Sequence, residues 1–72
     1  MDIKQRFGRV VRRRRRALEV SQEVFGFAIG MSQSYVSLIE NGQMNITLET
    51  VEQICVALKL EVPEMFSLLA EG

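Results

Sequence analysis

The chain has 72 residues, of which 47% are apolar, enough for one small domain with a modest core. We expect a single domain over residues 1–72, with no room for a separate catalytic or ligand-sensing domain. The formal net charge is zero and the isoelectric point is about 6.2, whereas nucleic-acid-binding domains usually have isoelectric points above about 9. The overall charge therefore does not by itself indicate a nucleic-acid partner.

The distribution of charge along the chain does indicate such a partner. Eight of the nine basic residues precede position 17 and, set against Asp2, give that segment a charge of +7. The rest of the chain carries eight glutamates against Lys59, a charge of −7. This asymmetry predicts that a polyanion binds one side of the protein.

The sequence lacks the residue clusters that catalysis or metal binding requires. It has no histidine, one cysteine (Cys55), and no serine with a recognisable base partner, so we expect no enzyme activity, metal or cofactor. Cys55 lies at a core spacing and is expected to be buried. No apolar signal-peptide segment follows the arginine cluster, which predicts a cytoplasmic protein that contacts no membrane. No segment indicates a site for a small-molecule effector.

Every predicted element is helical, because no segment alternates apolar and polar residues as a strand does. The first helix is expected from about Ile3 to Leu18. Arg14 interrupts its apolar stripe, and we expect the stem of Arg14 along the edge of the core with its charged head in water. The stripe itself consists of Ile3, Phe7, Val10, Val11 and Leu18.

The second helix is predicted to start near Ser21, an N-cap residue, with Glu23 placed to suit the helix dipole. It ends at Gly30, because glycine takes the left-handed C-cap conformation at little cost. Its inward-facing residues are expected to be Phe25, Ala28 and Ile29.

The third helix is predicted to start after Ser32 and to end at the Asn41-Gly42 pair. Its inward-facing residues are expected to be Val36 and Ile39. The sequence from about residue 21 to residue 41 thus reads as a helix-turn-helix, whose second helix fits the DNA major groove. Seven positions match that motif: a close-contact glycine at Gly26, a turn at Gly30, and the apolar residues Phe25, Ile29, Met31, Val36 and Ile39.

Two further helices complete the predicted elements. The fourth begins after Thr47, and its apolar face is expected to contain Leu48, Val51, Ile54, Cys55 and Leu58. The fifth, over about residues 63–70, carries Pro63 in its first turn. Its apolar residues cover more than one face, which predicts that they form a dimer interface: Met65, Phe66, Leu68 and Leu69.

Several short segments carry a resemblance to a known family: Ser21-Gln22-Glu23, Gly30-Met31-Ser32, Tyr35-Val36-Ser37, Ile39-Glu40-Asn41-Gly42, Thr47-Leu48-Glu49-Thr50 and Ala57-Leu58. They resemble the phage-repressor/Cro-like, or XRE, helix-turn-helix family. The resemblance implies an all-α, lambda-repressor-like fold of five helices. Phage repressors, controller proteins of restriction-modification systems and antitoxins all remain open, with the controller group most similar.

The resemblance also implies roles for individual residues. Gln22 would bond a DNA phosphate and brace Gln33, and glutamine is suited to a bidentate pair with adenine. The predicted base contacts are Gln33, Ser34, Tyr35 and Ser37. The predicted contacts to the DNA backbone are Gln22, Ser32, Asn41, Gln43, Asn45, Arg12 and Arg15.

Three departures from the family pattern stand out. Arg14 occupies a position that is usually a buried aliphatic residue, and Gly26 replaces an alanine. Val24 and Phe27 replace polar residues on the outer side of the second helix, where activating relatives contact RNA polymerase. This pair leaves two interpretations open: a surface for a protein partner, either RNA polymerase or a toxin, or packing against the stems of arginine side chains.

We therefore predict a sequence-specific, autoregulatory transcription regulator that binds double-stranded DNA. It would act as a homodimer on a palindromic operator, with half-sites about 34–36 Å apart. The alternatives are an antitoxin that binds a toxin as well as its own promoter, and a helical module with no role on DNA.

Overall fold

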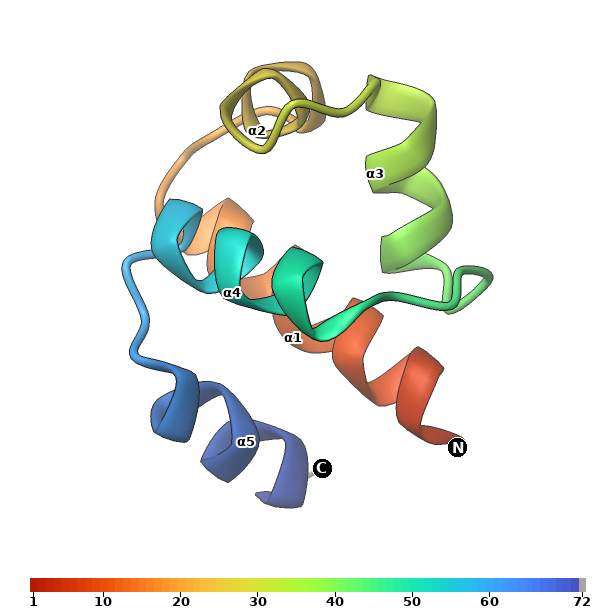
Figure 1. The fold of residues 1–72 in the computed structure, drawn as a ribbon, viewed down its shortest axis with the longest axis vertical. Coiled ribbons are helices and arrows are strands. Elements are labelled where there is room, and N and C mark those ends of the chain that lie inside the picture. Colours follow the sequence, from red (N-terminus) through yellow and green to blue (C-terminus); the bar gives the residue numbers. More distant parts are fainter. Residues whose placement is uncertain (72) are drawn as a thin grey trace.

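The computed structural model describes residues 1–71, in which five helices are joined by turns and loops without any strand, and this confirms the predicted all-α class. The helices are α1 (Ile3–Ala17), α2 (Gln22–Ala28), α3 (Gln33–Glu40), α4 (Leu48–Ala57) and α5 (Val62–Glu71). In Figure 1, α1 runs through the lower middle, α2 and α3 lie at the top and right, and α5 lies at the bottom. No helix among residues 1–71 is long and apolar enough to cross a membrane.

The first four helices begin where a side-chain oxygen accepts a backbone hydrogen bond from the third residue of the helix. Ser21, Ser32 and Thr47 do this as predicted, each accepting from the backbone nitrogen three residues on at 3.1 Å. Asp2 caps α1 in the same way, and the Gln5 side chain accepts in return from the Asp2 backbone nitrogen. These caps explain why the predicted helix starts agree closely with the observed ones.

The first four helices also share a way of ending, with one residue in the left-handed backbone region. Gly30 and Gly42 take it with φ angles of 72° and 73°, as their predicted C-cap roles require. Glu19 and Lys59 take it after α1 and α4, with φ angles of 59° and 58°. These two residues carry a side chain in a conformation that favours glycine, so each costs about 1–2 kcal/mol of backbone strain.

The core lies where the five helices meet, and it follows the predicted helix faces with three exceptions. Ile3, Ala28 and Leu48 were expected to face inward, and all three are exposed. The buried apolar residues are Phe7, Val11, Phe25, Ile29, Val36, Ile39, Ile54, Cys55, Leu58, Met65 and Leu69. Burial raises the pKa of the Cys55 thiol, and the negative charge of Glu52 adds to this effect. Cys55 is thus a core residue, as predicted.

The predicted dimer interface on α5 needs a correction. Met65 and Leu69 are buried within the protomer, where they belong to the core, so they are not free to contact a partner. Phe66 remains 50% exposed and Leu68 is half-buried. The helix has one inward face and one outer face, because successive apolar residues point in different directions around a helix.

The arginines of α1 hold the ends of the two C-terminal helices. The Arg14 Nε donates to the Leu58 carbonyl at the end of α4 at 2.9 Å, so its head is not left to water as predicted. The Arg6 Nη1 donates to the Leu69 carbonyl in α5 at 3.3 Å. Carbonyls at helix ends lack partners within the helix, and a cation there also suits the helix dipole.

A candidate nucleic-acid interface

The helices α2 and α3 approach each other closely across the turn. A Cβ atom placed on Gly26 would lie 2.8 Å from the carbonyl oxygen of Met31 and 3.1 Å from that of Ser32. The Met31 backbone nitrogen donates to the Gly26 carbonyl at 2.8 Å, which closes the turn. The predicted close-contact role of Gly26 is therefore confirmed, because a larger side chain there would hold α2 and α3 apart.

Helix α3 has a buried face and an exposed face. Val36, Ile39 and Glu40 are buried, whereas Gln33 and Ser34 at the start of the helix are exposed. Ser37 is half-buried, and Tyr35 is half-buried against the core. Two of the four residues for which the sequence predicts base contacts, Gln33 and Ser34, are thus exposed, and the other two are half-buried. Ser32, a predicted backbone contact, is exposed and uses its hydroxyl oxygen to cap α3.

The end of α3 is tied to α1 by a buried ion pair. The Arg15 Nε donates to the Glu40 Oε2 at 2.6 Å and the Arg15 Nη2 donates to the Glu40 Oε1 at 3.0 Å. A third nitrogen, Nη1, donates to the Val20 carbonyl at 2.8 Å. The hydrogen bond with Glu40 raises the pKa of Arg15, against the opposing effect of burial. The geometry is the bidentate fork in which arginine binds a carboxylate most specifically.

This pair argues against the predicted role of Arg15 as a contact to a DNA phosphate, because its guanidinium bonds to Glu40 and Val20 and its side chain is only 9% exposed. Gln22 is also placed differently from the prediction. Its amide nitrogen donates to the Glu40 Oε1 at 3.1 Å, so it braces the end of α3 and not Gln33. Gln22 is half-buried and borders the same surface hollow as Gln33.

Three exposed arginines form a ridge on the outer face of α1. Arg9, Arg12 and Arg16 are spaced three and four residues apart, so they share one side of the helix. Arg12 borders two hollows, one that contains Gln33 and one that contains Asn41. The ridge thus runs beside both ends of α3. In the loop after α3, Asn41, Gln43 and Asn45 are exposed, as backbone contacts would need.

Comparison with known proteins identifies the family. The profile of a helix-turn-helix family matches residues 11–65 of the chain. The chain belongs to this family of DNA-binding proteins. The resemblance that the sequence carries to the phage-repressor/Cro-like group is thereby confirmed.

Three relatives of this helix-turn-helix protein are control or controller proteins. The control protein C.MunI of a Mycoplasma species is 39% identical over 67 residues, covering 92% of this chain and 90% of the relative. The control protein C.SmaI of Serratia marcescens is 31% identical over 67 residues, covering 93% and 80%. The crystal structure of the restriction-modification controller protein C.AhdI from Aeromonas hydrophila matches with a TM-score of 0.80 and 37% identity, covering 86% and 90%. The predicted class, a transcription regulator related to controller proteins, is confirmed.

Sequence reasoning missed two features of this helix-turn-helix protein. A Cβ atom on Gly8 would collide with the Ile39 carbonyl oxygen and lie 2.7 Å from that of Glu40, so α1 and α3 touch backbone to backbone. A glycine inside a helix was the available signal. The buried position of Arg15 was not predicted, because five consecutive arginines resemble a single solvent-exposed segment. Only the helical spacing separates Arg15 from the exposed Arg12 and Arg16.

Proposed function

We propose that the protein is a controller-type regulator that binds its operator with α3 in the major groove. The observation that carries this proposal is that one face of α3 is buried in the protein, whereas polar side chains at its start are exposed to solvent. Val36, Ile39 and Glu40 fix the helix, while Gln33 and Ser34 stay exposed. Because the buried face fixes the position of the helix, little backbone entropy is lost when its exposed side chains bind, which favours specific reading of bases. We also propose a cytoplasmic location, where such an operator would lie.

Each residue on this surface has a proposed role. Gln33 pairs with adenine through its amide group, and Ser34, Ser37 and Tyr35 contact neighbouring base edges. Asn41, Gln43 and Asn45 contact phosphates, together with Gln22 and with the backbone at Ser32. Arg12 supplies salt-dependent attraction from the ridge on α1, and Arg9 and Arg16 on the same face add to it.

We propose that the protein acts as a homodimer, because a single protomer is too small for a palindromic operator. The Cα trace measures 27 Å along its longest axis. Half-sites one turn apart are about 34–36 Å from centre to centre, so two copies are needed to place one α3 in each. Of the four residues first predicted for the interface, Phe66 and Leu68 are the ones that reach the surface.

A competition experiment tests the proposed DNA binding. The purified protein is titrated against DNA from upstream of its own gene in a mobility-shift assay, with excess random DNA present. We expect a complex that survives the competitor, because specific complexes are typically at least a thousandfold tighter than non-specific ones. A complex that the competitor abolishes would mean that the arginines give only general attraction.

A second candidate function rests on the outer face of α2. Val24 is exposed there, and Phe27, one turn further along the same face, is 88% exposed. A phenylalanine this exposed favours contact with a protein partner, as in an antitoxin that covers a toxin or a regulator that touches RNA polymerase. Co-purification of the protein with the product of a neighbouring gene, lost in Phe27→Ser, would support this function. Purification as the homodimer alone would count against it.

A further inference from the structure

The loop after α3 contains both asparagines of the chain, Asn41 and Asn45. Both are exposed, and both are proposed to contact DNA phosphates. They differ in the residue that follows, which is Gly42 after Asn41 and Ile46 after Asn45. An asparagine followed by glycine is the pair most prone to deamidation, because glycine has no Cβ atom to shield the backbone nitrogen that attacks the amide.

The fold requires the glycine of this pair. The φ angle of Gly42 is 73°, in the left-handed region. A Cβ atom there would lie 2.8 Å from the Gln5 Cγ and 2.9 Å from the Gln5 Cα, so a larger residue would also press on α1. Asn41 contributes to the end of α3 through its backbone nitrogen, which donates to the Ser37 carbonyl at 3.0 Å. Most other residues could make that bond, so the fold does not require an asparagine at position 41.

We propose that Asn41 is a site of spontaneous deamidation and that the product binds DNA more weakly. The Gly42 nitrogen loses its proton to solvent and bonds to the Asn41 Cγ, and the side-chain amide nitrogen leaves as ammonia. Water then opens the resulting succinimide at one of its two carbonyls, which gives aspartate or isoaspartate. Either product adds one negative charge, and isoaspartate also adds a methylene group to the backbone. The effect on DNA binding rests on the proposed function, whereas the reaction itself does not.

The end of α3 controls access to this reaction. The Gly42 backbone nitrogen donates to the Ile39 carbonyl at 3.0 Å, and the ψ angle of Asn41 is 4°. Closure of the succinimide ring requires rotation about ψ, so this hydrogen bond has to break first. The Gln43 backbone nitrogen donates to the Leu38 carbonyl at 2.9 Å and closes the same turn. The reaction therefore occurs when this turn opens, as helix ends do more readily than helix interiors.

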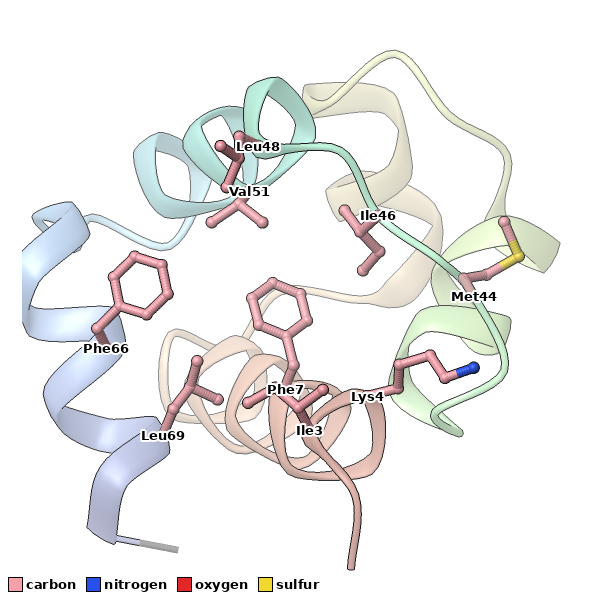
Figure 2. A pocket seen from close by; sticks show the side chains of 9 residues that line it. All are labelled: Ile3, Lys4, Phe7, Met44, Ile46, Leu48, Val51, Phe66 and Leu69. Carbon is pink, nitrogen blue, oxygen red and sulfur yellow. The ribbon is translucent and has the colours of Figure 1, made fainter.

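The other end of the loop is anchored, which distinguishes Asn45 from Asn41. Figure 2 shows Met44 and Ile46 among the residues that line an apolar hollow between α1, α4 and α5. Both are half-buried and pack against the core. Asn45 lies between them, and the branched side chain of Ile46 crowds the nitrogen that would attack its amide. Asn45 is therefore an internal control for Asn41.

A negative charge at position 41 acts on the basic surface proposed to bind DNA. Asn41, Arg9 and Arg12 border one hollow beside the end of α3. Glu40 borders it too, but its charge is already compensated by Arg15. A carboxylate at position 41 would attract the two exposed guanidinium groups and repel a DNA phosphate. Bound DNA, in turn, should hold the turn closed and slow the reaction.

Peptide mapping by mass spectrometry tests the modification. The purified protein is incubated at neutral pH for several weeks, with and without excess operator DNA, and isoaspartate is detected with an isoaspartyl methyltransferase. We expect a deamidated product at Asn41 that accumulates faster than any at Asn45, and more slowly when DNA is present. The assignment would be overturned if Asn41 stayed as intact as Asn45.

Matched variants test the effect on DNA binding. Asn41→Asp should weaken operator binding about tenfold at low salt and reduce the salt slope by about one, because repulsion replaces a phosphate contact. Gln53→Glu adds the same charge at an exposed position on α4 and is the control, which should bind as the unaltered protein does. Asn41→Gln keeps an amide but lacks the reactive pair. Its operator affinity should stay constant during the incubation, whereas that of the unaltered protein should fall.

The outcomes separate this inference from the proposed function. If the fresh protein does not bind its operator specifically, the proposed function and the effect on binding are both wrong, while the mass measurement still decides whether Asn41 reacts. If the fresh protein binds but its deamidated form and Asn41→Asp bind equally well, the proposed function stands and the effect on binding is wrong. Circular dichroism and thermal melts check that each variant is folded.

Discussion

The arginines of α1 have two different roles that depend on their positions around the helix. Arg6, Arg14 and Arg15 point toward the protein and bond to the ends of α5, α4 and α3, respectively. Arg9, Arg12 and Arg16 are exposed, with their side chains on the surface. We therefore expect the inward-pointing arginines to contribute to the stability of the fold and the exposed ones to the proposed attraction of DNA, and single substitutions should separate the two effects.

Arg15→Met should lower the free energy of unfolding by about 3–5 kcal/mol, because it leaves the buried Glu40 carboxylate without its cation. Urea denaturation followed by circular dichroism measures the change. Arg16→Met, a neighbouring exposed arginine, is the control and should alter the stability by less than about 0.5 kcal/mol. Equal effects of the two substitutions would contradict an internal role for Arg15.

Arg12→Met should leave the stability almost unchanged and reduce the salt dependence of DNA binding. Loss of one phosphate contact lowers the slope of log affinity against log salt concentration by about one. Binding titrations at several salt concentrations give the slope. An unchanged slope would show that Arg12 does not contact the DNA backbone in the complex.

At the scale of the helices, much of the fold follows from local signals in the sequence. Ser21, Ser32 and Thr47 mark helix starts and Gly30 and Gly42 mark helix ends, since caps satisfy backbone groups through side chains and φ angles near at hand. Whether an apolar helix face is covered depends on residues that are distant in the sequence. Leu48 and Ile3 continue apolar stripes, yet no other helix among residues 1–71 covers them, so their exposure was not predictable from periodicity.

The candidate site shows the same division between local and distant information. The exposed positions of Gln33 and Ser34 agree with the sequence pattern, because they follow from their places after the N-cap of α3. The ion pair between Arg15 and Glu40 joins residues 25 positions apart. Charge alone could not single out that pairing among the many arginines and glutamates of the chain.

The contact between α1 and α3 depends on the absence of a side chain at Gly8. Gly8→Ala should lower the free energy of unfolding by about 1–3 kcal/mol, because the added methyl group meets the carbonyl oxygens of Ile39 and Glu40. Helix propensity alone predicts the opposite sign, a gain of about 1 kcal/mol. Thermal and urea unfolding of the variant decide between them, with Ser67→Ala on the exposed side of α5 as the control.

At the scale of the whole molecule, the polar, basic surface and the apolar surface are separate. The front of α3 and the ridge of α1 form a polar and basic surface beside the turn. The apolar patch that includes Leu48 and Phe66 lies on α1, α4 and α5. A protein whose net charge is zero can therefore still attract DNA, because its arginines are concentrated on one helix and its glutamates are spread over the others.

The central claim is that α3 reads DNA bases through its exposed front. The most direct test compares Gln33→Ala with Gln53→Ala, an exposed glutamine on α4, by fluorescence anisotropy on the operator and on single-base variants of it. We predict that Gln33→Ala loses about 1–3 kcal/mol of binding free energy and its discrimination at one base pair, while Gln53→Ala binds as the unaltered protein does. Equal binding and equal discrimination by all three proteins would contradict the claim.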